Sequence, residues 1–577
     1  MTINRSILVL IAILTATACG PDNAGMPEQL DSSVADAVYR SGKVWTVNPA
    51  QPTAEAVAVR DGKIIFVGSD EEARSFIGPD TAVRDLGGRL MLPGFQDAHL
   101  HPISGGVEAS LCDLNGLGSV ALYRDRIAGY ATANPDVPWI TGGGWSMLAF
   151  GPGALASKKI IDELVADRPV FLTSQDGHSG WANSKALEIA GITKDTPDPP
   201  DGIIDRDPDT GEPVGSLQEG AMSLIEKHVP PMSVEQRVQG LKYARDMLHG
   251  YGITSIQEAS AYESDLEAYK ELDEAGQLNL RVVVALRWAH DEIEEQIPRL
   301  IDLRERYTKG NVRATTIKIM QDGVMENYTA VMLEPYRVPN RTKGIPMVDP
   351  EFLKTAVTLL DEAGFQVHFH AIGDAAVRQS LDAIEFAQAE NSGARNRHHI
   401  SHLELIDPAD IPRFAELGVT ANFQPLWAYP DSYITDLTLP FIGPERGQWL
   451  YPIGSVFESG GRVAFGSDWS VSTANPFVQI EVAVRRSDPE KADGAVLLSE
   501  QAVSLAQAIE AFTINSAWVN RLEAQTGSLE VGKAADLIVI DRNLFEIDPR
   551  EISETRVMMT MVDGKIVYQH APDENSQ

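Results

Sequence analysis

The chain has 577 residues, too many for one ordinary hydrophobic core, so two or more domains are expected. Its composition, with 43% hydrophobic and 23% charged residues, is that of a globular protein and excludes a largely disordered chain. The formal net charge of −34 would repel phosphate groups, so nucleic acid is excluded as an expected partner.

The first 18 residues are predicted to be an export signal. Arg5 precedes an apolar run at residues 6–14 that is too short to span a bilayer comfortably, and small residues follow it. The sequence Ala18-Cys19-Gly20 resembles a bacterial lipoprotein cleavage site, which would make Cys19 the lipidated N-terminus; the alternative is simple cleavage after Ala18. Residues 19–36 are then a tether, and the protein is expected to be periplasmic or anchored to a membrane of the bacterial envelope.

Short strands and tight turns occur at both ends of the remaining chain. Residues 37–47 and 54–67 alternate apolar and polar side chains, with a turn at Asp61-Gly62. Residues 557–568 repeat this pattern around Asp563-Gly564. We therefore expect residues 37–92 and 525–577 to form one small composite β-sandwich domain.

Between these ends, short apolar strands alternate with helix-length segments. Eight strands are expected to end near His99, Glu258, Arg287, Gln321, His370, His402, Gln424 and Asp468. This alternation predicts an α/β fold, a (β/α)8 TIM-type barrel over residues 93–524. The long interval after the first strand predicts an insertion at about residues 115–245.

Histidines gather at several of the predicted strand ends. His99 and His101 are two residues apart, so in an extended strand they project to one face and can chelate a divalent cation. His370 lies near the carboxyl end of its strand, where barrel active sites form, whereas His368 lies deeper and is expected to be structural. One member of a third group is also expected to reach the site: His398, His399 or His402.

A lysine and an aspartate complete the predicted cluster. Lys318 stands in an otherwise apolar strand, where a bare ammonium is costly but a carbamate would be an anionic metal ligand. The alternative is a pair between Lys318 and a carboxylate such as Asp322. Asp468 follows a glycine at a strand end and could be both ligand and proton acceptor, or only a helix N-cap. Together with the histidines, these residues predict a metal centre.

Several longer motifs accompany these residues. They are PGFQDAHLH ending at His101, Gly142-Gly143-Gly144-Trp145, Asp176-Gly177-His178-Ser179, HAIGDAA from His370, Gly466-Ser467-Asp468 and GSLEVGKAADL from Gly527. Through these motifs the chain resembles the amidohydrolase superfamily. Within that superfamily it resembles the amidohydrolase-3 branch, which includes N-substituted formamide deformylase-like proteins. The resemblance runs from roughly residue 37 to residue 568.

The resemblance implies a ligand set and a cofactor. The implied ligands are His99, His101, Lys318, His370, His402 and Asp468. Lys318 would bridge, with or without N6-carboxylation, and one or two divalent cations would be held, with zinc expected. The choice of His402 over His399 rests on the resemblance alone.

The resemblance also implies a reaction. A water activated by the cation would attack the carbonyl of a small amide-type substrate and cleave its C–N bond, with Asp468 as general base. His178, in the insertion, is the candidate catalytic residue that holds or polarises the carbonyl; the alternative is a histidine that only orders its loop. Glu258 is expected either to orient a ligand histidine or to form a salt bridge.

Aromatic residues near these motifs are candidate substrate contacts. Trp145 and Trp427 are the main ones, and Trp181, Phe150 and Tyr429 are further candidates, although aromatic residues are more often ordinary core.

Other functions fit the same residues. The site could act as an esterase, a cyclic amidase or a dipeptidase, or the chain could be an envelope lipoprotein that binds a metal or ligand without turnover. Lys318 and Asp468 together favour an enzyme, since capture alone needs no general base. A homodimer is the default expectation for such a barrel.

Overall fold

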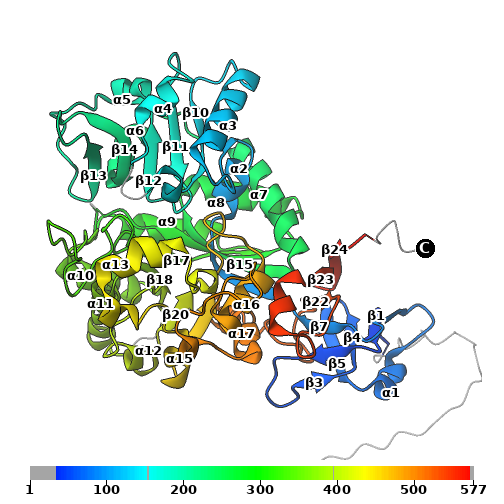
Figure 1. The fold of residues 1–577 in the computed structure, drawn as a ribbon. Helices are drawn as coiled ribbons and strands as arrows, with labels where there is room; N and C mark the ends of the chain where they lie inside the picture. Colours follow the sequence, from blue (N-terminus) through cyan, green and yellow to red (C-terminus); the bar gives the residue numbers. More distant parts are fainter. Residues whose placement is uncertain (1–33, 152–154, 291, 394–395, 572–577) are drawn as a thin grey trace, which may run out of the picture.

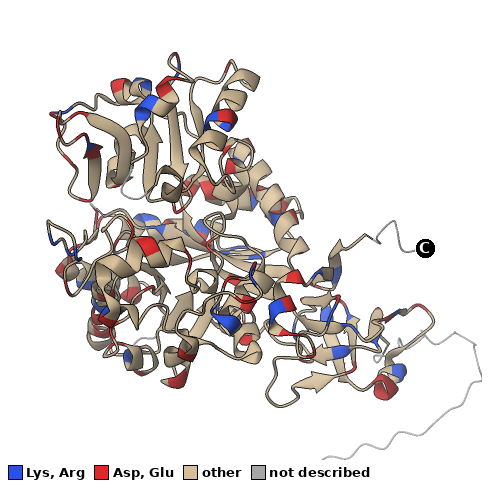
Figure 2. Cartoon of the chain, in the orientation of Figure 1, with Lys and Arg blue, Asp and Glu red and all other residues tan. Residues whose placement is uncertain are grey.

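The computed structural model describes residues 34–151, 155–290, 292–393 and 396–571 (Figure 1). The predicted signal segment, Cys19 and nearly all of the predicted tether lie outside these residues. A search of the described ranges finds no helix with the length and apolarity needed to cross a membrane. Acidic residues occur on helices and loops of all three parts of the molecule described below (Figure 2).

Eight parallel strands form the central barrel. They are β8 (Phe95–Leu100), β15 (Ile253–Ala261), β16 (Arg281–Arg287), β17 (Val312–Met320), β18 (Gln366–Ala371), β19 (His399–His402), β20 (Thr420–Phe423) and β21 (Arg462–Phe465). Each strand pairs with the next one in this order. Two backbone hydrogen bonds connect the segment after β21 to β8: Asp468 N–H donates to His99 O at 2.7 Å, and His101 N–H donates to Trp469 O at 2.6 Å. The predicted (β/α)8 barrel is confirmed.

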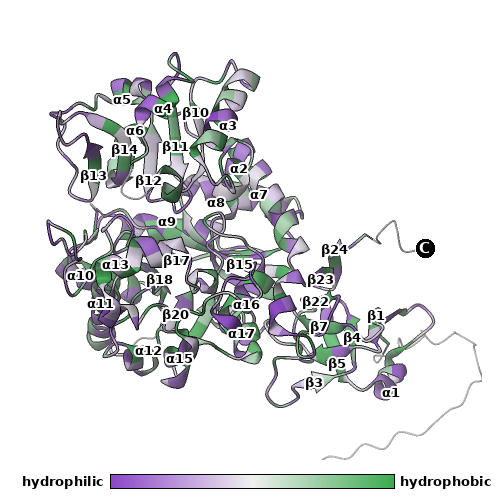
Figure 3. Ribbon diagram, in the orientation of Figure 1, coloured by the Kyte–Doolittle hydropathy of each residue, from purple (hydrophilic) through white to green (hydrophobic). Residues whose placement is uncertain are grey.

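The barrel strands and the helices around them bury a continuous apolar core. Figure 3 shows hydrophobic residues, in green, along these strands and helices. The surrounding helices include α8 (Glu263–Glu274), α9 (Ile297–Tyr307), α10 (Pro350–Glu362), α11 (Asp374–Glu390), α12 (Ile411–Leu417), α15 (Ile453–Glu458), α16 (Pro476–Arg485), α17 (Leu505–Ala511) and α18 (Ile514–Val519). Helix α10 shows why such segments fold as they do. Asp349 caps its first turn, a proline occupies the first position, and Leu353, Val357 and Leu360 recur at helical spacing on the buried face.

The insertion is a separate α/β body above the barrel (Figure 1). Its six-stranded sheet has the order β13-β14-β12-β11-β10-β9. The strands are β9 (Cys112–Asp113), β10 (Ile140–Trp145), β11 (Val170–Ser174), β12 (Ser179–Ala182), β13 (Gly202–Arg206) and β14 (Pro213–Glu219), and the helices include α3 (Val120–Ala133), α4 (Lys158–Asp162) and α5 (Ser184–Ala190). Two apolar clusters of its own, separate from the barrel core, hold this body together.

The chain returns to the barrel earlier than the predicted end of the insertion near residue 245. Helix α7 (Val234–Gly250) packs against α2 (Pro102–Glu108) and α8, so it belongs to the barrel layer. The two helices meet at glycines: a β-carbon built on Gly106 would overlap the carbonyl oxygen of Gly240. This close approach fixes both ends of the insertion on one side of the barrel.

The small β-domain joins the two chain ends. One sheet has the order β5-β4-β1-β6 and the other β24-β23-β22-β7-β2-β3. The strands are β1 (Ala37–Arg40), β2 (Lys43–Trp45), β3 (Thr53–Ala54), β4 (Ala56–Arg60), β5 (Lys63–Gly68), β6 (Ala82–Asp85), β7 (Leu90–Pro93), β22 (Leu537–Ile540), β23 (Val557–Val562) and β24 (Lys565–Gln569). Strands β7 and β22 pair antiparallel across the two termini, and apolar residues of both sheets share one core.

Replacing Gly106 with alanine should destabilise the protein by about 1–3 kcal/mol, because the added methyl group overpacks the contact between α2 and α7. Thermal unfolding of the Gly106→Ala variant should show a melting temperature below that of the parent protein. The matched control is Gly129→Ala in α3, where a β-carbon would meet no atom within 4 Å and alanine favours the helix by about 0.5–1 kcal/mol. Equal melting temperatures for the two variants would contradict the packing described for α2 and α7.

Candidate metal centre and active site

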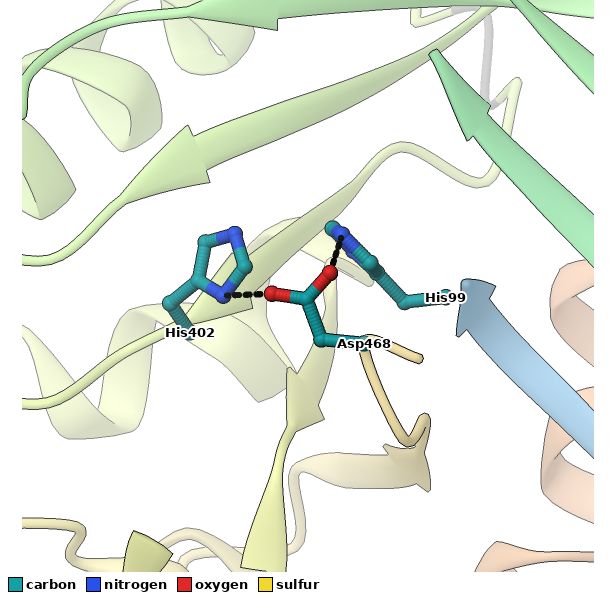
Figure 4. Close-up of side chains that lie close together, drawn as sticks. All are labelled: His99, His402 and Asp468. Carbon is teal, nitrogen blue, oxygen red and sulfur yellow. Dashed lines mark ion pairs between the residues drawn. The ribbon is translucent and has the colours of Figure 1, made fainter. Parts of the chain in front are cut away.

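Three buried side chains from distant parts of the sequence meet at the carboxyl ends of the barrel strands (Figure 4). They are His99 on β8, His402 on β19 and Asp468 beyond β21. Their potential ligand atoms all lie within 4.8 Å of one another. Asp468 Oδ1 is 3.3 Å from His99 Nε2, and Oδ2 is 3.8 Å from His402 Nδ1. A carboxylate and two imidazoles in this arrangement can hold a divalent cation.

The other predicted histidines border this group. His101 Nε2 lies 3.2 Å from Asp468 Oδ1. The ring of His370 lies 4.3 Å from the ring of His402, measured between centroids. In the parallel register, Met320 stands beside His370 and Ala371 beside His402, which aligns the ends of β17, β18 and β19.

Lys318 belongs to the same interior. It is 2% exposed and stands in register with His368 on the neighbouring strand. Burial lowers the pKa of its amine to about 7, although the charge of Asp468 acts in the opposite direction. The uncharged amine is therefore accessible near neutral pH, as carbamate formation requires. The alternative partner, Asp322, instead accepts backbone N–H groups from Val331, Ile372 and Gly373.

Two residues of the cluster have left-handed backbone conformations. The φ angle is +79° at His402 and +52° at Asp468. For residues other than glycine this conformation costs about 1–3 kcal/mol and persists where the surroundings enforce it, commonly at functional sites. The strain therefore coincides with the predicted ligands.

The donor atoms fit a cation. His370 Nδ1, His402 Nδ1 and Asp468 Oδ1 are buried, and within the described residues none of them makes a hydrogen bond of good geometry, although His370 Nδ1 lies 3.3 Å from Asp322 Oδ1. Leaving such atoms unsatisfied costs about 1–3 kcal/mol each, and a coordinated cation would remove that cost. Imidazole nitrogen and carboxylate oxygen are ligands that zinc and similar ions accept.

The protonation states also suit coordination. Burial, reinforced by the charge of Lys318, lowers the pKa of His99 to about 3, which keeps this imidazole neutral. Burial opposes the ionisation of Asp468, yet the neighbouring His99 and His101 hold the pKa of its carboxyl well below the usual range. A neutral imidazole and an ionised carboxylate are the ligand forms of His99 and Asp468. His101 differs, because Asp468 and Glu258 outweigh its burial and raise its pKa to about 9, so coordination by this ring would release a proton.

Several buried groups contact the predicted ligand histidines on the side away from Asp468. His368 Nε2 is 2.9 Å from His99 Nδ1 and 2.7 Å from Ser401 Oγ, so this histidine has the structural surroundings expected of it. Glu258 Oε1 lies 3.6 Å from His101 Nδ1, and the Tyr269 hydroxyl donates to Glu258 at 2.9 Å. Such partners fix the orientation of a ligand ring.

Asp97 is a supporting residue that the sequence reasoning missed. Its Oδ1 accepts the backbone N–H groups of His99 and Ser467, each at 3.0 Å, which ties the end of β8 to the end of β21. Burial raises the pKa of this carboxyl to about 7. The sequence did contain one indication of this role: Asp97 is the only carboxylate in a fully buried strand, two residues before His99.

The structure distinguishes His402 from His399. The ring of His399 packs on His368 at 4.0 Å, deeper in the barrel, and its Nδ1 lies 3.4 Å from the Asn422 amide nitrogen. His398 faces Asp361 at 3.0 Å. Neither is in the group of His99, His402 and Asp468, so the geometry favours His402 as the ligand.

His178 reaches the site from the insertion. It lies between β11 and β12, and its ring centroid is 5.2 Å from that of His370. Its Nδ1 is 2.7 Å from Glu219 Oε2. Burial lowers the pKa of His178, but the charge of Glu219 outweighs it and raises the pKa to about 9. Glu219 is a second residue that the sequence reasoning missed, because no local pattern connects it with His178.

The two tryptophans have different surroundings. The Trp427 ring is stacked on the His402 ring at 5.6 Å, with 7° between the planes, so it lies at the site. Trp145 is 2% exposed, packs against Phe150 and Trp181, and donates its indole N–H to Leu172 O at 2.8 Å. The prediction that Trp145 contacts substrate is therefore corrected: its ring belongs to the core of the insertion.

The barrel and its buried imidazole and carboxylate cluster define a metal-dependent hydrolase. The model of the amidohydrolase family matches residues 82–568, and the chain belongs to this family. It is 32% identical to the protein LONG AFTER FAR-RED 3 of Arabidopsis thaliana over 93% of this chain and 92% of that one. It is 30% identical to the putative amidohydrolase YtcJ of Bacillus subtilis, over 92% and 99% of the two chains.

A relative with a named activity and a solved structure extend this comparison. The N-substituted formamide deformylase of Arthrobacter pascens is 26% identical over 92% of this chain and 98% of its own. An uncharacterized metal-dependent hydrolase from Pyrococcus horikoshii has a TM-score of 0.70 and 25% identity, covering 89% of this chain and 99% of that structure. The predicted membership of the amidohydrolase-3 branch is confirmed.

Replacing His402 with glutamine should weaken the binding of a divalent cation, so less cation is bound per chain. The loss of affinity should exceed the roughly 10–100-fold loss that follows removal of a residue that only supports a ligand. His399→Gln, on the same strand and equally buried, is the matched control and should retain the cation. Elemental analysis of both folded proteins measures the difference. Cation lost from His399→Gln and kept by His402→Gln would reverse the assignment.

Proposed function

We propose that this protein hydrolyses an amide-type C–N bond in a small molecule with the help of a bound divalent cation. The proposed ligands are His99, His101, Lys318, His370, His402 and Asp468. The observation that carries the proposal is the buried, ionised Asp468 grouped with His99 and His402, with His178 facing the same group from the insertion. The Arthrobacter relative, which bears the name of an N-substituted formamide deformylase, supports an amide-type substrate.

The cofactor proposed here is zinc, as one ion or two, with Lys318 as a bridging ligand in carbamate form. When bound, such a cation would polarise the substrate carbonyl and make a coordinated water acidic. The burial of Lys318 and the pKa of about 7 of its amine support carboxylation of this residue.

Asp468 is the proposed general base. Its carboxylate is ionised, and Oδ1 lies 3.3 Å from His99 Nε2 and 3.2 Å from His101 Nε2. This oxygen therefore stands among the proposed ligands, where it would take a proton from the attacking water. The same oxygen would then pass the proton to the leaving nitrogen. This role requires a distance of about 2.6–3.2 Å to the water.

His178 and Trp427 are the proposed substrate contacts. Since Nδ1 of His178 is engaged by Glu219, Nε2 is the nitrogen left for a substrate, and it would donate to the carbonyl oxygen on which negative charge develops. Trp427, stacked on His402, would supply an apolar wall beside the reacting carbonyl.

Replacing Asp468 with asparagine should lower kcat by about 10²–10⁴-fold, because the amide cannot accept the proton of the water. The fold should persist, and much of the cation should remain bound. Assays on N-formyl and N-acyl amines, with esters for comparison, measure the loss. The matched control is Asp349→Asn at the N-cap of α10. Aspartate and asparagine cap helices about equally well, so the activity of this variant should be unchanged. Near-wild-type turnover by the Asp468 variant would rule out this proton path.

Removal of the cation should abolish amide hydrolysis while leaving the chain folded. A chelator followed by gel filtration, with the cation content measured before and after, tests this, and added Zn²⁺ should restore the rate. Undiminished hydrolysis by protein shown to be free of cation would contradict the proposed chemistry.

A further inference from the structure

We infer that Glu219 is a positioning residue that fixes the ring of His178 over the barrel mouth and so makes the insertion a working part of the active site. The inference rests on the proposed function, in which His178 contacts the substrate carbonyl. Glu219 is the last residue of β14, 41 positions from His178 in the sequence.

The carboxylate of Glu219 connects the insertion to the barrel. Its Oε2 is 2.7 Å from Nδ1 of His178, and its Oε1 accepts the hydroxyl of Thr329, in the segment after β17, at 2.7 Å. The side chain is 2% exposed. A buried carboxylate is costly unless it is paired and hydrogen-bonded, so both oxygens of Glu219 depend on these two partners.

This contact determines which nitrogen of His178 faces outward to a ligand. Burial opposes the ionisation of Glu219, but His178 outweighs it and lowers the pKa of the carboxyl, so the oxygens act as acceptors. Nδ1 of His178 must then donate, and Nε2 remains for substrate. The ring is held 5.2 Å from the ring of His370, beside the proposed cation ligands.

The surrounding backbone is shaped to receive this carboxylate. A β-carbon built on Gly323 would overlap both Glu219 Oε1 and Thr329 Oγ1, so the segment after β17 leaves space where the two side chains meet. Glu219 itself has a φ of +51° and a ψ of −131°, a sparsely populated backbone conformation that costs a residue with a side chain about 1–3 kcal/mol.

Docking of the insertion alone does not require Glu219. Ser146 Oγ lies 2.7 Å from the Tyr433 hydroxyl, the Asn327 amide donates to Ser179 Oγ at 3.1 Å, and the Gln175 amide donates to Val471 O at 3.0 Å. These contacts already join the two bodies around the mouth. The contact of Glu219 with His178 therefore acts on the site.

A double-mutant cycle tests the inference. Glu219→Gln should lower kcat by about 10–100-fold with little change in KM or cation content, since one oxygen of the carboxylate pair is replaced by an NH₂ group that cannot accept. His178→Gln should lower kcat at least as much, and the double variant should lose no more than His178→Gln alone. Losses that multiply in the double variant would overturn the inference, because Glu219 would then act independently of His178.

Two further measurements separate the possible failures. Tyr433→Phe removes another contact between the insertion and the barrel, and it should stay within about twofold of the parent rate; a loss equal to that of Glu219→Gln would indicate general loosening and overturn the inference. A crystal structure of Glu219→Gln should show the His178 ring turned from its place, and an unmoved ring would refute the inference without any substrate. If the parent protein hydrolyses no amide, the proposed function fails, and the ring position alone decides the role of Glu219.

Discussion

The buried carboxylate of Asp468 is the constraint on which the rest of the site depends. It is 5% exposed and ionised, and a charge so far from water is tolerated when it is paired, hydrogen-bonded or coordinated. Its neighbours are His99 and His101, more than 360 positions earlier in the chain. The backbone hydrogen bond from Asp468 N–H to His99 O is also one of the bonds that close the barrel. The same backbone contact therefore helps to close the barrel and holds Asp468 beside His99.

Next to the cluster, inside the barrel, buried polar groups contact one another and fix one another's orientation. Asp97 ties the ends of β8 and β21 together, His368 engages His99, and Glu258 lies behind His101. Because these partners are buried and directed, the ligand rings have little freedom to rotate. A site whose geometry is fixed in advance loses little free energy in ordering its residues when cation and substrate bind.

The insertion serves a different purpose from the barrel. It folds around its own apolar clusters, so its surface loops can differ without disturbing the barrel core. His178, held by Glu219, brings that separate body into contact with His370, one of the predicted ligands of the barrel. In our proposal, the barrel supplies the cation ligands and the proton acceptor, and the insertion supplies the group that faces the substrate carbonyl.

The sequence by itself determined the barrel, the pairing of the chain ends in one β-domain and the existence of an insertion, because strand periodicity and turn residues are local signals. It also pointed to His99, His101, Lys318, His370 and Asp468, since polar residues at the ends of apolar strands are conspicuous. The residues alone left His399 and His402 open, and the resemblance to a known family chose His402. Only the tertiary structure gave a geometric reason for that choice, placed Trp145 in a core, assigned α7 to the barrel and brought Glu219 to His178. Each of these depends on packing between segments far apart in the chain, and no local pattern encodes which distant side chain lies across a contact.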